Sequence, residues 1–195
     1  MSILSKSLER IKPSPTISVT QKARELKAKG ADIISLGSGE PDFDTPDNVK
    51  SAAIEAIKNG QTKYTAVDGT VDLKNAIVSK FKKENNLTYE KNQISVGAGG
   101  KQVIYNAFLA TINSGDEIII PSPFWVSYPD IVLLAGGIPK IIECGEEDNF
   151  KLTAKSLKKN ITQSTKWIII NSPGNPTGSC YSCLLYTSPS PRDPT

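Results

Sequence analysis

Short apolar runs alternate with helix-like segments along this sequence, and the alternation constrains the fold more than any other feature. Runs rich in β-branched residues at 117–121, 138–143 and 167–170 are typical of buried strands, and helix-like segments separate them. Strands that alternate with helices of about 8 to 15 residues form parallel sheets covered by helices on both faces. The sequence therefore predicts an α/β fold with a mostly parallel sheet. The expected strands are 32–36, 93–96, 117–121, 138–143 and 167–170, and the expected helices are 18–29, 47–58, 71–85, 101–112, 126–134 and 153–160.

Three segments make up the expected domain organisation. Residues 1–30 form an N-terminal arm and helix, residues 31–182 form the α/β domain, and residues 183–195 form a tail. The tail is rich in Pro, Ser and Thr and has neither helical nor strand periodicity. It is either a disordered native tail or non-native sequence from cloning or assembly. We favour non-native sequence, because the tail follows a loop that should lead into a helix.

Composition excludes several classes of protein. The net charge is +3 and the basic residues are scattered, which does not support nucleic-acid binding. The apolar runs fall short of the ~20 residues of a membrane span and the N-terminus lacks a signal peptide, so we expect a cytoplasmic protein away from the membrane. The sequence has no histidine, which excludes a Ser-His-Asp triad and His-rich metal sites.

The three cysteines do not indicate a site. Cys180 and Cys183 form a CxxC pair, but a metal site normally needs a second ligand pair and a redox pair normally opens a helix after a strand. Neither context is present, so we expect no metal. Cys144 is expected to be a small core residue.

Three loops after predicted strands are candidate sites, because ligands bind at the carboxyl ends of strands in open α/β sheets. The loop NSPGNPTG at 171–178 is either a ligand-binding loop or a simple strand-ending turn.

The glycine-rich turn at 97–102 opens a helix, where backbone N–H groups and the helix dipole favour phosphate. It matches neither a Walker A loop nor a dinucleotide fingerprint, because Gln102 stands at a position that those patterns give to other residues. The segment PFWVSYP at 123–129 offers aromatic rings that either stack on a planar ligand or pack in the core.

Taken together, six segments resemble one family in order and spacing. From about Ile11 to Gly178 the sequence resembles the class I aminotransferases, which are pyridoxal 5'-phosphate (PLP) enzymes of fold type I, and specifically the bacterial aspartate and aspartate-prephenate aminotransferases. The chain would be an N-terminal fragment that contains part of the PLP-binding large domain. The segments are IKPSPT, GEPDFDTP, TKYTAVDG, GGKQ, PFWVSYP and NSPGNPTG.

The resemblance assigns cofactor contacts to matching positions. Trp125 matches the aromatic residue that stacks on the pyridine ring, and Asn175 matches the side chain that hydrogen-bonds the phenolic oxygen. Tyr64 matches a tyrosine that reaches the cofactor phosphate of the neighbouring subunit, which implies a homodimer. In the family a cis bond often precedes the proline at Pro176. The positions that match the phosphate-binding segment are Gly99, Gly100 and Lys101.

The resemblance also assigns substrate contacts. Gly39 matches a position whose backbone meets the substrate α-carboxylate, and Asn175 matches a side chain that lies close to the substrate carboxylate. Trp125 is a further expected substrate-binding residue. Lys12 matches a lysine that members of the subgroup use towards the distal carboxylate of dicarboxylic substrates. The implied substrates are small amino acids and 2-oxo acids, with transfer from L-aspartate to 2-oxoglutarate and, in some members, to prephenate.

The residues that perform the chemistry lie C-terminal to the NPTG loop in the family. These are the Schiff-base lysine, an aspartate on the pyridine nitrogen and an arginine on the α-carboxylate. No lysine in this sequence matches the Schiff-base position, so we nominate no catalytic residue and expect the chain as given to be inactive. The alternatives are an aromatic or alanine aminotransferase, a related lyase, or a non-catalytic fragment. An aminotransferase-like domain of a transcription regulator is disfavoured, because the resemblance begins at Ile11.

Overall fold

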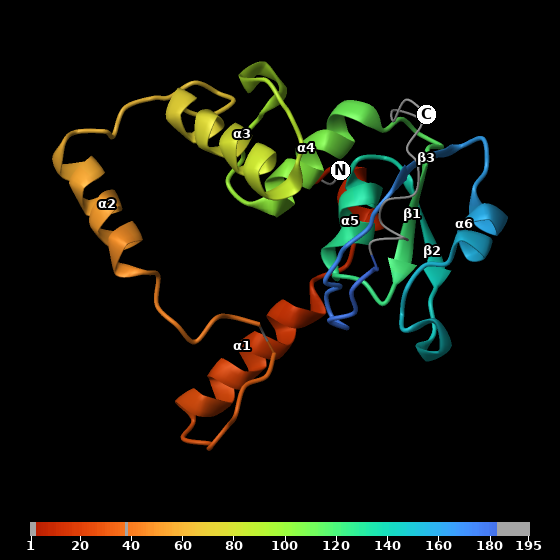
Figure 1. Ribbon diagram of the computed structural model, residues 1–195. Coiled ribbons are helices and arrows are strands. Elements are labelled where there is room, and N and C mark those ends of the chain that lie inside the picture. The colour runs from red at the N-terminus through yellow and green to blue at the C-terminus, as the bar shows by residue number, and fades with distance from the viewer. Residues whose placement is uncertain (1–2, 38, 183–195) are drawn as a thin grey trace. The chain divides into compact units, whose positions relative to one another are not determined.

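Two compact units are present in the computed structural model, which describes residues 3–37 and 39–182 (Figure 1). The first unit comprises residues 1–15 and 104–195, and the second comprises residues 16–103. The predicted tail at 183–195 lies outside the described residues. No helix among the described residues is long and apolar enough to cross a membrane.

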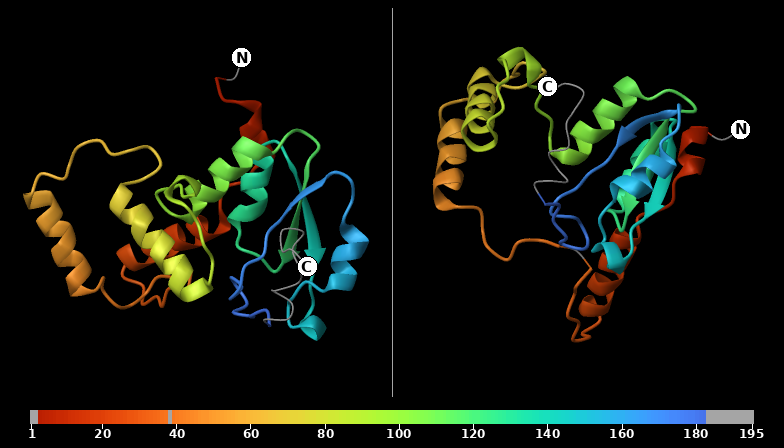
Figure 2. Two further views of the ribbon diagram at one scale, coloured as in Figure 1. Left: turned by 45° about the horizontal axis from the view of Figure 1, so that its top comes forward. Right: turned by 45° about the vertical axis from the view of Figure 1, so that its right-hand side comes forward.

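A three-stranded parallel sheet forms the centre of the first unit. Its strands are β1 (Glu117–Ser122), β2 (Ile138–Glu143) and β3 (Thr165–Ile168), in the order β2-β1-β3. The helices α5 (Ser127–Leu134) and α6 (Ala154–Asn160) lie on opposite sides of the strands, as Figures 1 and 2 show. The predicted α/β fold with a parallel sheet is therefore confirmed.

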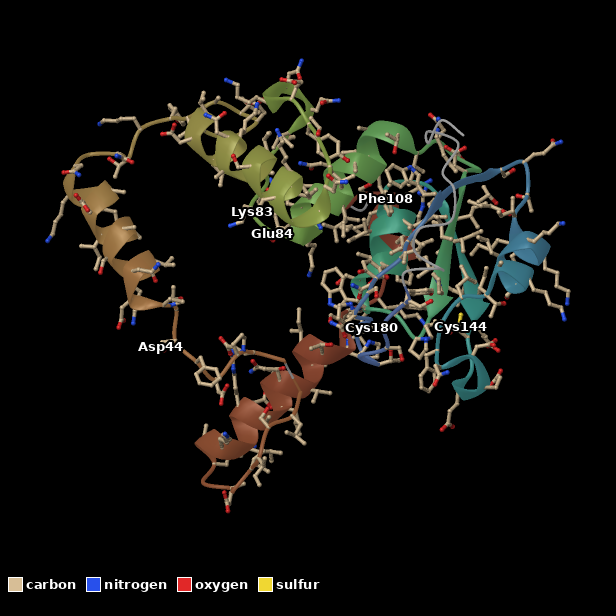
Figure 3. The ribbon with its side chains drawn as sticks, in the orientation of Figure 1. Asp44, Lys83, Glu84, Phe108, Cys144 and Cys180 are labelled. Carbon is tan, nitrogen blue, oxygen red and sulfur yellow. The ribbon has the colours of Figure 1, made fainter. Side chains whose placement is uncertain are left out.

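Alternate residues of β1 supply the two hydrophobic cores of this unit. Ile118 and Ile120 pack in one core with Phe108 of α4 (Gly100–Thr111) and Val132 of α5. Ile119 packs in the other core with residues beyond β2 and before α6, including Cys144 and Leu152. Figure 3 labels Phe108 and Cys144, one from each core. The predicted core position of Cys144 is confirmed, and the period-2 alternation of β1 explains why an uninterrupted isoleucine run is buried on both faces.

The pairing of β1 with β3 contains one irregularity. Glu117 pairs with Thr165, but Ile118 pairs with Trp167, so β3 has one extra residue at this point. Trp167 packs edge to face on Phe108, with ring centroids 5.4 Å apart, and its Nε1–H donates to Thr111 Oγ1 at 3.0 Å. The irregularity is a β-bulge, which lets Trp167 face the same core as Ile118.

Two glycines connect α5 to β2. Gly136 has a φ of +90°, a conformation that glycine adopts at little cost. Gly137 lies against the core instead, because a Cβ added there would be 2.7 Å from Ile118 Cδ1 and 2.9 Å from Ile112 Cγ2. Its N–H donates to Val132 O at 3.0 Å, which fixes the turn.

Three helices dominate the second unit. They are α1 (Pro15–Ala28), α2 (Asp47–Lys58) and α3 (Val71–Asn85). The Thr70 side chain caps α3 by accepting a hydrogen bond from Leu73 N, and Asn86 ends it in the left-handed conformation. The bounds of α2 and α3 are those that the sequence predicts. Short 3-10 helices complete the described elements, namely η1 (Lys6–Arg10), η2 (Lys91–Gln93) and η3 (Glu146–Asp148).

Two predicted strands are wrong. Residues 32–36 form no strand, and Ile34 and Leu36 are 87% and 92% exposed. Residues 93–96 also lie outside any strand, although Val96 N donates a hydrogen bond to Asp68 O at 3.0 Å. Both runs have strand-like composition, but a strand requires a ladder with a neighbour, and no described segment provides one.

Candidate active site

The NSPGNPTG loop, residues 171–178, follows β3 and is held by hydrogen bonds within itself. The Asn171 side-chain oxygen accepts a hydrogen bond from Asn175 N at 2.9 Å, and Gly178 N donates to Gly174 O at 2.7 Å. The Ser172–Pro173 and Asn175–Pro176 peptide bonds are cis, as the resemblance suggests for Pro176. The Asn175 side chain is exposed and makes no hydrogen bond to a described residue, so its amide is available to a ligand.

Asn171 is a functional candidate that the sequence analysis did not single out. Its side chain fixes the backbone of Asn175, the residue expected to contact the cofactor. The sequence contains the signal, because an Asn at the start of a Pro- and Gly-rich loop commonly accepts hydrogen bonds from nearby backbone N–H groups.

A pocket lies between this loop and the carboxyl ends of β1 and β3. Its lining combines apolar and aromatic side chains with two asparagines, which is typical of sites for small organic ligands. Tyr128 belongs to the lining and is buried, and burial raises the pKa of its phenol. The lining includes Phe124, Tyr128, Phe150, Asn171, Asn175 and Tyr181.

Trp125 is linked to this pocket through Tyr128. The two rings pack edge to face, with centroids 5.3 Å apart and an interplanar angle of 80°. Trp125 is half-buried, so one side of its indole packs in the core while the remainder is accessible. Lys12, the other predicted residue of this unit, is exposed and does not line the pocket.

The glycine-rich turn of the second unit has the backbone geometry of an anion site. Gly99 has a φ of +93°, α4 begins at Gly100, and the hydrogen bond from Val103 N to Gly99 O closes its first turn at 3.3 Å. The first N–H groups of a helix have no partner within the helix and attract anions. A Cβ added at Gly99 or Gly100 would meet no atom within 4 Å, so the backbone is open to a ligand. The Gln102 side chain accepts from Ala98 N and braces the turn.

Gly39 and Tyr64 also belong to the second unit. Both are exposed, and Tyr64 is fully so. The glycine-rich turn lies in this unit as well, whereas Lys12, Trp125 and Asn175 belong to the first unit.

The amino end of the sheet, opposite the loop, carries a polar network. The Glu117 carboxylate accepts hydrogen bonds from Thr162 Oγ1 at 2.7 Å and from Lys140 Nζ at 3.0 Å. These two hydrogen bonds lower the pKa of Glu117, the first of them most. The network ties β1 to β2 and to the segment before β3, so its role is structural.

The cysteines have different environments. Cys144 is buried, and burial raises the pKa of its thiol, with a further contribution from Asp148. Cys180 is exposed and free, whereas Cys183, its expected CxxC partner, lies outside the described residues.

Comparison with known proteins defines the class to which this fold and loop belong. Residues 31–185 match the Aminotransferase class I and II family, and the chain belongs to this family. The resemblance inferred from the six segments is thereby confirmed.

Relatives of the chain include aspartate/prephenate aminotransferases. It is 62% identical over 182 residues to the probable aspartate/prephenate aminotransferase of Rickettsia bellii, covering 93% of this chain and 46% of the relative. It is 61% identical to the aspartate/prephenate aminotransferase of Cereibacter sphaeroides, covering 93% of this chain and 45% of the relative. The chain thus spans about half the length of the curated relatives it matches.

Solved structures of aspartate aminotransferases have the same fold. The Thermus thermophilus enzyme with maleate gives a TM-score of 0.92 at 42% identity and covers 95% of this chain and 48% of that chain. The Rhizobium meliloti enzyme gives a TM-score of 0.90 at 46% identity, with coverages of 95% and 46%. The predicted fold type is confirmed by these matches.

Proposed function

We propose that the protein to which this chain belongs transfers the amino group of L-aspartate to 2-oxoglutarate with the help of PLP, and that it also uses prephenate as an acceptor. The identity of 61–62% to aspartate/prephenate aminotransferases, over 93% of the chain, carries this proposal. On this basis residues 31–182 are part of the PLP-binding large domain.

The described residues fit PLP in three respects. The open backbone at Gly99 and the first turn of α4 suit the phosphate group, and we assign this role to Gly99, Gly100 and Lys101. The accessible part of Trp125 suits stacking on the ring. The exposed side-chain amide of Asn175, whose backbone N–H donates to the Asn171 side chain, suits the phenolic oxygen. When bound, PLP supplies an electron sink for charge that develops at the substrate Cα.

Substrate recognition is assigned to four residues. The Gly39 backbone is assigned to the α-carboxylate, Trp125 and Asn175 are assigned to the substrate as well, and the Lys12 ammonium would pair with the distal carboxylate. Lys12 is exposed and therefore accessible to a ligand. A dicarboxylate preference also agrees with the maleate that accompanies the Thermus thermophilus relative.

The active form is proposed to be a cytoplasmic homodimer. Full exposure of Tyr64 within its own unit agrees with a tyrosine that completes the phosphate site of a second subunit.

The test compares amino donors with the full-length protein and PLP. We expect L-aspartate to be used with a higher kcat/KM than L-phenylalanine or L-alanine with 2-oxoglutarate as acceptor, and we expect prephenate to accept from L-aspartate. Lys12→Met should lower kcat/KM for L-aspartate about tenfold, since it removes a charged partner, and should leave L-alanine unchanged. Preference for L-alanine or L-phenylalanine would replace the proposal by one of the other aminotransferase activities.

A separate proposal concerns residues 1–195 alone. We propose that this chain does not transaminate, because none of its lysines matches the one that binds the cofactor covalently in the family. The chain would be incubated with PLP, reduced with borohydride and mapped for labelled lysines. A uniquely labelled lysine together with transamination would contradict this proposal.

A further inference from the structure

An ion pair between a buried lysine and a half-exposed aspartate lies at the start of α3. Lys74 is 8% exposed, which makes it the one buried charged residue among those described, and its ammonium binds the Asp68 carboxylate. The Asp68 side chain is half-exposed. Burying an ammonium costs free energy unless it is paired with an opposite charge, so the burial of Lys74 depends on its contact with Asp68. The hydrogen bond from Lys74 lowers the pKa of Asp68, which keeps this carboxylate ionised at neutral pH.

The pair lies where two segments of the second unit meet. Asp68 O accepts the hydrogen bond from Val96 N at 3.0 Å. The next residue, Gly69, packs so closely that a Cβ added there would lie 2.7 Å from Val96 Cγ2. Its φ of +107° is a second reason for glycine at this position. The end of the 62–70 loop is thus fixed on the segment that leads into the glycine-rich turn.

Each segment carries a proposed phosphate contact. Tyr64 lies in the loop before Asp68, and Gly99 lies in the turn after Val96. Tyr64 is fully exposed, so its own surroundings do not fix its position. Ordering a mobile loop on binding costs conformational entropy, and a loop that is already anchored binds more tightly.

We infer that the Asp68–Lys74 pair is a positioning device, which fixes the Tyr64 loop relative to the glycine-rich turn. One subunit would then present its own phosphate site and its contribution to the partner's site at a fixed spacing. The inference rests on the proposed function, because Tyr64 and Gly99 bind phosphate only if the protein is a PLP enzyme. Lys74 and Asp68 act through Tyr64 and are therefore positioning residues.

The test measures PLP affinity of the full-length protein by spectroscopic titration. Lys74→Met should weaken PLP binding about tenfold, within the range of coupling found for contacting groups. Lys74→Arg, which keeps the charge, should stay within about twofold of wild type. The matched control is Lys80→Met on the same helix, because Lys80 pairs with Glu84 at 3.5 Å on an exposed surface, where ion pairs contribute little.

A double-mutant cycle separates positioning from general stability. In a Tyr64→Phe background the Lys74→Met effect should fall below about twofold, because the contact that the pair positions is already lost. An undiminished effect in that background, or an equal effect of Lys80→Met, would overturn the inference. Asp68→Asn takes the place of Lys74→Met if circular dichroism shows that the latter does not fold. If the wild-type protein binds no PLP, the proposed function fails and this inference fails with it. If the wild-type protein, Lys74→Met and Asp68→Asn all bind PLP with the same affinity, the inference alone is overturned.

Discussion

Gly137 is the position where the structure leaves the least room for a side chain in the core of the first unit. A Cβ there would approach the tips of three core side chains, at 2.7 Å from Ile118 Cδ1, 2.9 Å from Ile112 Cγ2 and 3.2 Å from Val132 Cγ1. Ile118 and Val132 are fully buried, so neither can move into solvent. Because well-packed interiors tolerate added methyl groups poorly, Gly137→Ala should destabilise the protein by about 2 kcal/mol.

The cause can be checked by removing the atom that clashes most. Ile118→Val deletes Cδ1 and should cost about 1 kcal/mol alone. Combined with Gly137→Ala, it should cost less than the sum of the single changes by about 1 kcal/mol, because the deleted methyl leaves space for the new one. The neighbouring Gly136→Ala is the matched control. Its Cβ meets no atom, so its cost of about 1 kcal/mol comes from the positive φ alone and should simply add to that of Ile118→Val.

The assay is chemical denaturation of the full-length protein, in which the free energy of unfolding of each variant is compared with wild type. Additive costs for Gly137→Ala and Ile118→Val would refute the steric explanation. Equal coupling of Ile118→Val to Gly136→Ala would refute it as well, since that glycine has open space beside it.

Three further predictions concern the loop, the sheet edge and a thiol. Asn171→Ala should weaken PLP binding of the full-length protein about fivefold, measured by spectroscopic titration, because it removes the acceptor for Asn175 N, whereas Asn171→Asp should keep most of the affinity. The pKa of Glu117 is lower in the folded protein than its ordinary value of 4.5, so ionised Glu117 stabilises the fold fully above pH 4.5 and loses this effect as the pH falls through the folded pKa. Glu117→Gln should therefore weaken the fall of the free energy of unfolding at acid pH, measured by denaturation at a series of pH values. Iodoacetamide should modify the exposed Cys180 in the native protein while the buried Cys144, whose pKa is raised, stays unmodified, as peptide mass spectrometry can check.

Helices and central strands were predictable because local patterns determine them. The predicted bounds of α2 and α3 match the structure, since caps and turn residues such as Thr70 and Asn59 stand at their ends. The bounds of β2 also match, whereas β3 begins and ends earlier than expected. The strands expected at 32–36 and 93–96 failed because strand formation depends on a neighbour, which composition does not reveal.

The candidate site was predictable to a different degree. The order of the six segments led to the family and to the loop that carries Asn175, and the family match confirms that route. The hydrogen bond from Asn175 N to Asn171 is local, and the Asn at the start of the loop is its signal in the sequence. The pair of Asp68 with Lys74 was not predictable, because it depends on how the 62–70 loop folds back on α3. Roles of individual residues in binding PLP or substrate stay predictions.

The bulge beside Glu117 determines which face of the sheet each later side chain of β3 occupies. With straight pairing from Glu117 and Thr165, Trp167 would stand opposite Ile119 and enter the wrong core, and every residue after it would exchange faces. The extra residue, Lys166, therefore shifts the alternation of β3 by one position, so that Trp167 faces the same core as Ile118 and the chain enters the 171–178 loop with this alternation. Deleting Lys166 would place Trp167 directly after Thr165 and still opposite Ile118, so it would remove the bulge and keep the faces of the later side chains.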